Sequence, residues 1–214
     1  MSPSSRSLLD LGAGAGTAAL VAMAHEPSLT ATLVESDPEM AGLAALNLAE
    51  NGFAGRGRVL TLDVAAPGRE RVAAGLAADH FATVIANPPF FDPALGTAPA
   101  ASRTGARHMA ATELVRWVKA AAAHAAPGGE AIFIYPAAGL AGLLAAFAGR
   151  FGAITVLPLV PHAGEPASRI LVRGSKGSRA PLRLLASRVL HRRGGGGFQP
   201  EFEAALRGHA RLVW

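Results

Sequence analysis

Asp10-Leu-Gly-Ala-Gly-Ala-Gly16 is the stretch that decides how the rest of the sequence is interpreted. A short apolar run, Leu8 and Leu9, precedes it, and an alanine-rich segment with helical character, residues 17–24, follows it. The stretch therefore predicts a strand, a glycine turn and the start of a helix. Glycine suits such a turn because the backbone bends sharply there and a ligand can approach it where a Cβ would stand in the way.

The spacing of the glycines separates two kinds of nucleotide-binding turn. A dinucleotide fingerprint needs Gly-x-Gly-x-x-Gly, but Thr17 occupies the position of its third glycine, which disfavours a nicotinamide oxidoreductase. Gly12, Gly14 and Gly16 instead follow Asp10 in a pattern that resembles the first motif of S-adenosylmethionine-dependent methyltransferases. The resemblance implies that the loop surrounds the methionine part of this cofactor and that Asp10 accepts a hydrogen bond from its ammonium group, directly or through water. The alternative is a glycine-rich turn without a ligand.

Composition indicates one domain of an intracellular enzyme. A chain of 214 residues, half of them hydrophobic, can bury a substantial core as one domain, residues 1–214. The absence of cysteine excludes disulfides, thiolate metal sites and cysteine nucleophiles, and a cytoplasmic location is expected. The longest apolar segment, residues 137–148, is too short to span a bilayer, and the histidines lack paired metal-ligand spacing. Neither a membrane nor a metal ion is expected.

Charge is divided unevenly along the chain. Residues 1–149 carry 9 Lys and Arg against 12 Asp and Glu, whereas residues 150–214 carry 11 against 3. A basic last part is typical of a protein with a polyanionic partner, since neutralised phosphates dominate nucleic-acid affinity. The alternative is a biased genome, because 18 of the 20 basic residues are arginine. Within the basic segment 160–214, where strands and a short helix are expected, the candidates for phosphate contacts are Arg192 and Arg193, with Arg173 and Arg179 as further ones.

Strand-like and helix-like segments alternate along the chain. Strands are expected at 8–9, 31–34, 59–62, 81–86, 131–135, 154–159 and 169–172, with a further candidate at 182–190. Helices are expected at 17–24, 38–51, 68–78, 107–126, 137–150 and 200–206, and a loop over 92–105. This alternation predicts a doubly wound, Rossmann-like α/β fold, with a seven-stranded, mostly parallel sheet, an antiparallel terminal hairpin and helices on both faces.

Polar groups follow each of the first four expected strands. Glu35 ends the second and can accept both hydroxyls of an adenosine ribose, or it is a solvated loop acid. Asp63 follows the third and can bind the amino group of adenine, or it caps the next helix. Asn87 follows the fourth. Ligands of such sheets bind at the carboxyl ends of the strands, so these groups and the glycine turn are expected to surround one site.

The fourth strand runs into Asn87-Pro88-Pro89-Phe90-Phe91. An amino nitrogen conjugated to an aromatic ring is hard to methylate because its lone pair is delocalised. The Asn87 side-chain oxygen and the Pro88 carbonyl can each accept one N–H of such an amine and aim its lone pair at a methyl donor, while Pro88 and Pro89 fix that carbonyl. Phe90 can stack on a base rotated out of a nucleic acid, and Phe91 can wall the pocket. The alternative is a rigid turn with two buried aromatic rings.

Together these motifs resemble the bacterial tRNA adenine-N6 methyltransferases that modify the purine beside the anticodon of valine tRNA. The resemblance covers nearly the whole chain and rests on Asp10–Gly16, Glu35, Asn47, Asn87–Phe91, the pair Ala106-Arg107 and the expected strand Arg169–Val172. It implies a class I S-adenosylmethionine-dependent enzyme that methylates N6 of an adenine in tRNA. Arg107 is a candidate for clamping the phosphate near the flipped base, or for a surface salt bridge.

Other substrates share the first two motifs. Ribosomal guanine-N2 methyltransferases carry a similar Asn-Pro-Pro-Phe that is usually followed by histidine rather than Phe91, and protein glutamine methyltransferases end the motif in tyrosine. Family members carry a few dozen residues before the glycine strand, whereas nine precede Asp10 here. We therefore expect either a missing segment or another element that covers the cofactor. A non-catalytic RNA-binding relative is the remaining alternative.

Overall fold

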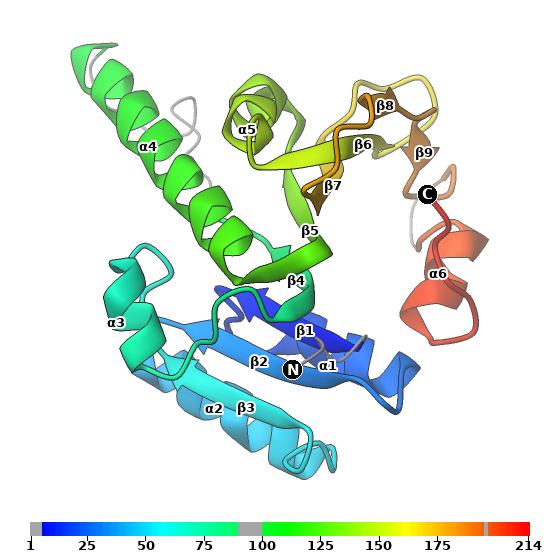
Figure 1. The fold of residues 1–214 in the computed structure, drawn as a ribbon. Coiled ribbons are helices and arrows are strands. Elements are labelled where there is room, and N and C mark those ends of the chain that lie inside the picture. The colour runs from blue at the N-terminus through cyan, green and yellow to red at the C-terminus, as the bar shows by residue number, and fades with distance from the viewer. Residues whose placement is uncertain (1–5, 90–99, 195–196) are drawn as a thin grey trace.

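A computed structural model of the chain describes residues 6–89, 100–194 and 197–214, with the backbone alone at 100–111. The strands of the described residues form one sheet of nine with helices on both faces (Figure 1). These strands are β1 (Ser7–Leu11), β2 (Thr30–Glu35), β3 (Gly57–Thr61), β4 (Phe81–Ala86), β5 (Ala125–Pro136), β6 (Phe151–Val160), β7 (Arg169–Lys176), β8 (Arg183–Leu184) and β9 (Arg188–Val189). The helices are α1 (Thr17–His25), α2 (Pro38–Glu50), α3 (Gly68–Ala73), α4 (Ala100–His124), α5 (Leu140–Phe147) and α6 (Pro200–Leu206), with a 3-10 turn, η1 (Ala137–Gly139), before α5.

The order of the strands is β3-β2-β1-β4-β5-β7-β6-β8, with β9 also paired to β6. Strands β1 to β5 pair in parallel, whereas β7 lies antiparallel between β5 and β6. The expected Rossmann-like sheet with an antiparallel hairpin near its end is therefore confirmed. The expected count of seven strands is too low for the described part of the chain. Residues 182–190 form two short strands beside β6, broken at 185–187.

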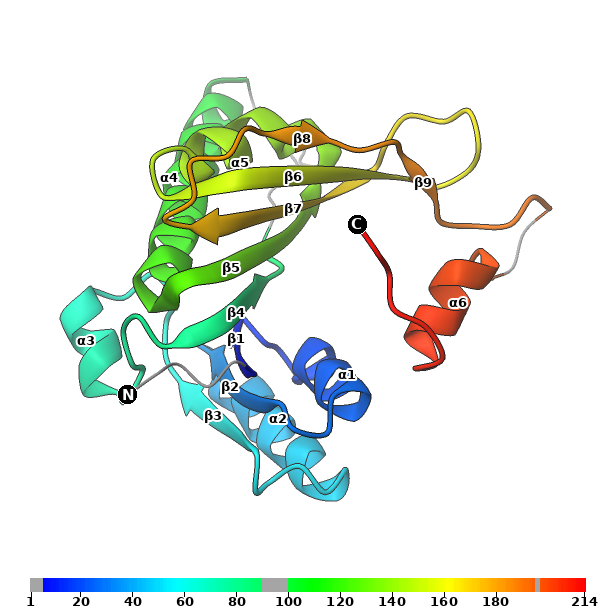
Figure 2. The same cartoon turned by 45° about the vertical axis from the view of Figure 1, so that its right-hand side comes forward.

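The two faces of the sheet bury separate cores. Leu8 of β1 packs in one core with α1 and α2, whereas Leu9 packs in the other with α4 and α5, because alternate residues of a strand face opposite sides. All five residues of β1 are buried, as expected for a parallel strand covered on both faces. Figure 2 shows α1 and α2 on one side of the sheet and α4 and α5 on the other. Strand β1 is thus fixed from both sides.

The segment from α6 onward covers the β6–β7 end of the sheet and lies beside α1 (Figure 2). Phe202 packs there with Leu157, Leu159 and Trp214. The guanidinium carbon of Arg173 lies 4.7 Å from the centroid of the Trp214 ring, and its Nη2 donates to the Trp214 carbonyl at 2.8 Å. Arg173 therefore fastens this segment to the sheet, which argues against the phosphate contact predicted for it.

Helix boundaries differ from expectation at three places. Helix α4 begins at Ala100, so residues 100–105 are helical where part of a loop was expected, because no proline interrupts the alanine-rich run from Ala100 to Pro127. Helix α3 ends at Ala73 and α5 at Phe147, earlier than expected, since a glycine follows each closely. Helix α2 is as predicted, with the Asp37 carboxylate accepting a hydrogen bond from the Glu39 N–H at 2.8 Å.

Strand β5 is longer than expected at its start. Residues 127–129, a Pro-Gly-Gly run expected to end the preceding helix, lie inside it. The register against β4 shifts there, between the Phe81–Ala125 and Thr83–Glu130 pairs. Such a bulge lets the chain leave α4 and enter the sheet without a separate loop.

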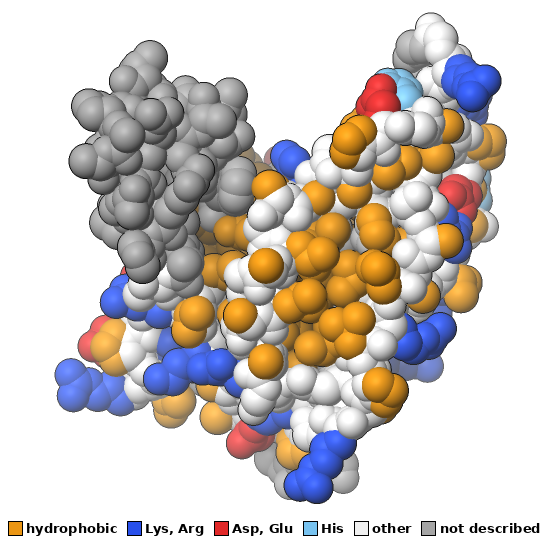
Figure 3. Space-filling view, turned by 90° about the horizontal axis from the view of Figure 1, so that it is seen from above, with side chains coloured by type: hydrophobic (Ala, Val, Ile, Leu, Met, Phe, Trp, Pro, Cys, Tyr) orange, Lys and Arg blue, Asp and Glu red, His pale blue; other side chains and the backbone are white. Residues whose placement is uncertain are grey.

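The face of the molecule that carries α5 and β8 is apolar in its middle (Figure 3). Leu182 and Leu184, in and next to β8, leave 48% and 66% of their surface exposed. Lys and Arg side chains gather around the rim of this face instead. A polyanion is therefore expected to contact the rim and not the middle.

A buried polar network joins the loop after β3 to the end of α4. Arg71 is 7% exposed, and its Nε donates to His124 Nε2 at 3.0 Å while its Nη1 donates to the Val64 and Ala66 carbonyls. Because arginine only donates, His124 Nε2 accepts and the imidazole is neutral, with its Nδ1 proton shared with the Ala77 carbonyl at 2.9 Å. Burial lowers the pKa of His124, and the charges of Arg71 and Lys176 add to this effect.

This network makes folding stability sensitive to acid. The folded-state pKa of His124 is lowered. The stabilisation that neutral His124 gives the folded state is therefore complete above the unfolded pKa of about 6.5 and is lost as the pH falls. His124→Gln keeps a donor and an acceptor but does not titrate, and we expect it to lower stability by about 1–3 kcal/mol at pH 7.5. Thermal unfolding at pH 7.5 and 5.0 should show the gap between wild type and variant closing at the lower pH. A gap that stays constant would contradict the neutral, buried imidazole.

Candidate functional site

The ends of three neighbouring strands meet at one edge of the sheet. Leu11, the last residue of β1, pairs with Val34 of β2 on one side and with Ala86, the last residue of β4, on the other. Gly12 and Asn87 follow Leu11 and Ala86 directly, so they begin at the tips of strands about 4.8 Å apart. The glycine turn and the Asn-Pro-Pro segment therefore leave the sheet side by side, as the sequence predicted.

The two predicted acids also lie at this edge. Glu35 is the last residue of β2 and pairs with Thr61, the last residue of β3. Asp63 follows two residues later. The parallel register thus brings the glycine turn, Glu35, Asp63 and Asn87 to consecutive strand ends, which confirms their expected placement.

The glycine loop is held by backbone contacts to β2. The N–H groups of Gly12 and Ala13 both donate to the Val34 carbonyl, at 2.8 and 3.0 Å. The Gly14 N–H donates to Glu35 Oε2 at 2.8 Å, and Asn47 Nδ2 of α2 donates to the Ala15 carbonyl at 3.0 Å. The loop is therefore fixed in place by protein contacts from β2 and α2.

The three glycines have different reasons to be glycine. All have positive φ, but a Cβ on Gly12 would lie 2.4 Å from Cη2 of Trp117, and one on Gly16 would lie 2.8 Å from Cδ2 of Leu33. A Cβ on Gly14 would have only Met40 Cε nearby, at 3.8 Å. The sharp bend expected of these glycines is present at all three. Packing within the protein also requires Gly12 and Gly16, whereas a Cβ on Gly14 would meet only the Met40 side chain, at an ordinary van der Waals distance.

Asp10 is a buried carboxylate beneath this loop. It is 4% exposed, and its Oδ2 accepts a hydrogen bond from the Ala19 N–H, in the first turn of α1, at 3.2 Å. Gly16, the N-cap of α1, has no side chain to do this. Burial raises the pKa of Asp10 to about 6 against the lowering effect of the Ala19 N–H, and the charge of Glu35 raises it further. A cation bound close to both carboxylates would relieve this repulsion.

Glu35 is held as an ionised acceptor. Its Oε2 accepts from Gly14 and its Oε1 from the Asp37 N–H at 2.9 Å. Burial opposes ionisation, but hydrogen bonds from the backbone of Asp37, Gly14 and Ser36 hold the pKa of Glu35 below its usual value. Oε1 also accepts from the Ser36 hydroxyl at 3.3 Å, so the further lone pair for a ligand hydroxyl is on Oε2.

Asp63 is exposed and turns the chain after β3. Its Oδ1 accepts from the Ala65 N–H at 2.8 Å. The alternative role, as N-cap of the next helix, is wrong because α3 begins only at Gly68 and Pro67 holds the cap position. Arg71 fixes the carbonyls of this turn from below, as described above.

The Asn-Pro-Pro segment combines an exposed acceptor with a buried anchor. Asn87 and Pro89 are exposed, and Pro88 between them is buried. Phe90 and Phe91 lie outside the described residues, as does the side chain of Arg107, whose backbone belongs to α4. The Asn87 side chain is therefore exposed to solvent, while the buried Pro88 anchors the turn in the core.

Two buried aromatic residues were not singled out from the sequence, and one of them, Trp117, supports the site. Trp117 of α4 packs its ring against Gly12. Tyr135 of β5 is buried against Gly139, and burial, with the charge of Glu113, raises its pKa. Helical periodicity places Trp117 on a core-facing stripe, but nothing in the sequence tells which loop that stripe meets.

The predicted RNA contacts lie several strands away from the glycine loop. Arg192 and Arg193 follow the carboxyl end of β9, which pairs with β6, and β4, β5 and β7 separate β6 from β1 in the strand order. Arg192 Nη2 pairs with Glu203 at 2.8 Å, and its Nε donates to the Phe198 carbonyl at 2.9 Å. Arg193 is exposed. A phosphate contact by Arg192 therefore competes with an existing ion pair, whereas Arg193 meets no such competition from the described residues.

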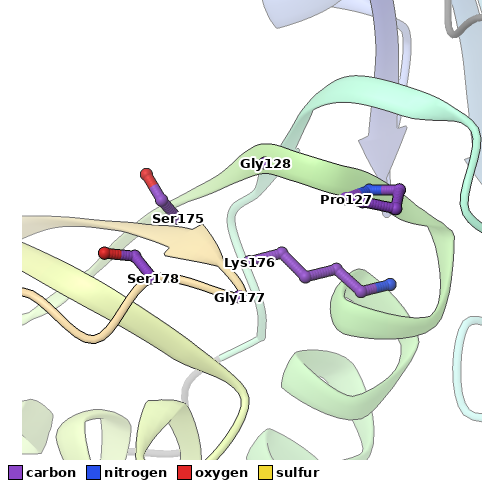
Figure 4. A pocket seen from close by; sticks show the side chains of 6 residues that line it. All are labelled: Pro127, Gly128, Ser175, Lys176, Gly177 and Ser178. Carbon is purple, nitrogen blue, oxygen red and sulfur yellow. The ribbon is translucent and has the colours of Figure 1, made fainter.

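A hollow of about 500 Å³ lies at the opposite edge of the sheet (Figure 4). It is lined by Pro127, Gly128, Ser175, Lys176, Gly177 and Ser178. Its charged group is already used: Lys176 Nζ donates to the Asp79 carboxylate, to the Ala122 carbonyl of α4 and to the Ala125 carbonyl at the start of β5. This hollow is therefore a less suitable ligand site than the strand ends around Gly14.

Two kinds of feature are absent from the described part of the chain. No helix there combines the length and apolar character needed to cross a membrane. No group of three or more His, Cys, Asp or Glu side chains is placed there to hold a metal ion.

The groups around Gly14 fit S-adenosylmethionine, the cofactor implied by the sequence. That molecule presents an ammonium group, a ribose diol and an adenine amine, all hydrogen-bond donors. Asp10, Glu35 and Asp63 are acceptors of matching kind, and the Gly14 backbone is open where a side chain would fill the space.

Known proteins share this architecture. The family model described as Methyltransferase small domain matches residues 1–138. A solved predicted O-methyltransferase, protein Atu636 from Agrobacterium tumefaciens, is 32% identical with a TM-score of 0.81, over 97% of this chain and 91% of that chain. TrmN from Thermus thermophilus shares the fold with a TM-score of 0.58 at 21% identity, over 82% of this chain and 45% of that chain.

A curated relative matches part of the chain. The tRNA1(Val) (adenine(37)-N6)-methyltransferase from Flavobacteriaceae bacterium (strain 3519-10) is 30% identical over 87 residues, which are 41% of this chain and 34% of that protein. The match thus spans about a third of the length of that relative. Since the family model matches more than half of the chain and the Agrobacterium protein is similar along nearly all of it, the chain belongs to the methyltransferase small domain family, in which S-adenosylmethionine is the methyl donor.

Proposed function

We propose that this chain transfers a methyl group to the exocyclic amino nitrogen of an aromatic base, and that its substrate is N6 of an adenine in tRNA. The observation that carries the proposal is the pairing of Leu11 with Ala86, which sets the glycine loop and Asn87 at neighbouring strand tips. A methyl donor on the loop and an amine at Asn87 would share one cleft. The partial similarity to an adenine-N6 methyltransferase of tRNA supports this choice of substrate.

The carboxylates hold the cofactor in this proposal. Asp10 accepts from its ammonium group, Glu35 from its ribose hydroxyls and Asp63 from its adenine amine, while Gly14 lets the backbone come close. When bound, S-adenosylmethionine supplies a methyl group carried on a positively charged sulfur. The loop contacts to β2 and α2 keep these acceptors in place before the cofactor arrives, which lowers the entropic penalty of binding.

The Asn-Pro-Pro segment holds the amine. The Asn87 side-chain oxygen and the Pro88 carbonyl each accept one N–H, which draws the nitrogen out of conjugation and fixes its lone pair in one direction. Burial of Pro88 and the locked φ of both prolines hold these acceptors still. Proton loss follows methyl transfer, so no strong base is needed beside Asn87. Phe90 and Phe91 are proposed to stack on and enclose the base, and Arg107 to bind its phosphate.

A second candidate is methyl transfer to oxygen. It is favoured by the Agrobacterium protein, described as a predicted O-methyltransferase and similar over 97% of this chain. A hydroxyl nucleophile needs a base, whereas an amine needs acceptors. Asp10, whose pKa of about 6 would suit a base, lies buried and bound to the start of α1. Among the described residues at these strand ends, acceptors for an amine are therefore better placed than a base for a hydroxyl, and guanine N2 or a protein amide are alternatives of the same chemistry.

Removing the Asn87 side chain should slow methyl transfer strongly and leave cofactor binding nearly unchanged. We expect Asn87→Ala to lower kcat by at least about 100-fold, as for loss of a well-placed transition-state contact, while the Kd for S-adenosylmethionine changes less than about twofold. Asn87→Asp keeps an oxygen acceptor and serves as the matched control, with a smaller loss. The readouts are calorimetry and mass spectrometry of nucleosides after incubation with unmodified tRNA. A methylated oxygen in the product, or an unchanged kcat for Asn87→Ala, would refute amine transfer.

The charge of Asp10 should lower folding stability and strengthen cofactor binding. Because its folded-state pKa is raised from 3.8 to about 6, ionisation destabilises the wild type as the pH rises through this range, by up to roughly 3 kcal/mol above it. Asp10→Asn keeps an acceptor for Ala19 but carries no charge. We expect it to melt at a higher temperature than the wild type at pH 8, with the difference shrinking toward pH 4.5.

The same variant should bind the cofactor worse, by about 10- to 100-fold at pH 8, because a charge-assisted hydrogen bond is lost. Calorimetric titration with S-adenosylmethionine measures this. Unchanged affinity would remove Asp10 from the cofactor site, and a lower melting temperature at pH 8 would contradict the raised pKa.

A further inference from the structure

A hairpin extends β9 beyond the sheet. The Gln199 N–H donates to the Leu190 carbonyl at 2.7 Å and the Arg192 N–H to the Gly197 carbonyl at 3.2 Å, and His191 pairs with Phe198 between them. Residues 190–194 continue past the end of β9, and residues 197–199 return beside them (Figure 2). It is fixed on the sheet side by the bond from the His191 N–H to the Pro161 carbonyl at 3.0 Å.

Three rings, called the stack here, lie against one another on this hairpin and the loop beside it: His191 stacks on Phe198, and His162 is tilted against His191. The ring of His191 lies 5.1 Å from that of Phe198 at an interplanar angle of 29°, and 5.7 Å from that of His162 at 47°. Phe198 is 38% exposed. The hydrophobic cluster that holds α6 contains Phe202 and Trp214 but not Phe198, so this stack is not part of that core. Exposed aromatic rings of this kind are the surfaces on which unpaired bases stack.

Two exposed cations lie close to the rings along the chain: Arg193 follows His191 by two residues, and Arg169 begins β7 after the loop that carries His162. Arg193 is exposed and pairs with no acid among the residues described, and Arg169 is exposed with its Nη1 on the Ser168 carbonyl at 3.1 Å. Arg192, by contrast, is bound to Glu203 and the Phe198 carbonyl, and therefore fixes the hairpin itself. Glu165 is the acid of the neighbouring loop. The stack lies within residues 150–214, which carry 11 Lys and Arg against 3 Asp and Glu. Its surroundings are therefore mainly basic.

The register places this surface at the edge of the sheet that carries the transfer site. Strands β6 and β9 end at Val160 and Val189, and both run in the same direction as β4, since β7 reverses β5 and β6 reverses β7. From the row of Ala86, the ladder crosses about 15 Å to β6 and continues about 20 Å along it to His191. A partner that reaches both places is therefore much larger than one nucleotide.

We propose that the stack of His162, His191 and Phe198, with Arg193 and Arg169, is a docking surface for RNA that lies outside the transfer site. An unpaired base of the RNA stacks on Phe198, and its neighbouring phosphates contact the two arginines. The surface selects substrates long enough to span both places, so it acts on binding and not on the chemistry. This inference rests on the proposed RNA substrate, but it makes no use of the modified atom.

The test measures RNA binding directly. Fluorescence anisotropy with unmodified tRNA compares the wild type with Phe198→Ala, Phe198→Tyr, Arg193→Ala and, as a matched control on α3 at the far end of the sheet, Arg69→Ala. We expect Phe198→Ala to weaken tRNA binding at least about fivefold. Phe198→Tyr should bind tRNA as tightly as the wild type, because stacking needs only an aromatic ring. Arg193→Ala should lower the slope of log K against log salt by about one, and Arg69→Ala should leave it unchanged.

Methylation provides the second readout. Phe198→Ala should raise KM for whole tRNA and leave kcat unchanged, and it should not affect a dinucleotide that contains the target adenine, which is too short to span both places. Equal affinity and salt slope in all variants would overturn the docking surface even if tRNA is methylated. Weaker tRNA binding by the variants without any methylation would support the surface and refute the proposed function instead. A loss of affinity that Phe198→Tyr does not restore would show a structural role and overturn base stacking.

Discussion

The parallel pairing of β1 between β2 and β4 is the constraint on which the rest of the structure depends. Leu11 is the last residue of β1 and pairs on both sides, so whatever follows it must emerge beside the ends of β2 and β4. A shift of one residue would exchange the two cores of β1, because Leu8 and Leu9 face opposite sides. The hydrophobic pattern therefore fixes the register, and the register places the glycine loop beside Asn87.

Two buried ionisable side chains, Asp10 and Arg71, help to shape the strand ends of the candidate site. Asp10 stabilises the start of α1 although burial and Glu35 disfavour its ionised form. Arg71 is buried without a carboxylate in its described hydrogen bonds, and it holds the turn after β3 through two carbonyls and His124. Asp10 lies one residue before the end of β1, and Arg71 reaches the turn after β3. Both cost more than an apolar residue would in a core built for stability alone. Their placement is consistent with a site organised before its ligand binds.

Much of the fold could be predicted from the sequence because its signals are local. The glycine turn, the Asp37 cap of α2 and strand β4 appear where pattern and turn chemistry place them. Helix α4 and the division of residues 182–190 were harder, since an alanine-rich run does not show where a helix starts, and pairing with β6 decides where the short strands lie. Long-range packing had no local signal.

For the candidate site, too, local features could be predicted from the sequence and long-range contacts could not. The candidate residues at strand ends were predictable, because parallel strands bring their carboxyl ends together. Their individual environments were not. Trp117 requires Gly12 to be glycine, and Trp214 binds Arg173, and each contact joins residues far apart in the sequence. The ion pair of Arg192 with Glu203 likewise depends on how α6 folds back on the hairpin.

The glycine loop and Asn87 are proposed to form one continuous cleft. The most direct measurement is calorimetric binding of a bisubstrate ligand in which the N6 nitrogen of adenosine is joined by a short linker to the position of the donor methyl in an S-adenosylmethionine analogue. One cleft predicts a Kd at least about 100-fold below that of the unlinked analogue, because the second part binds without a further loss of freedom. A linked ligand that binds no more tightly than the analogue alone would contradict the account.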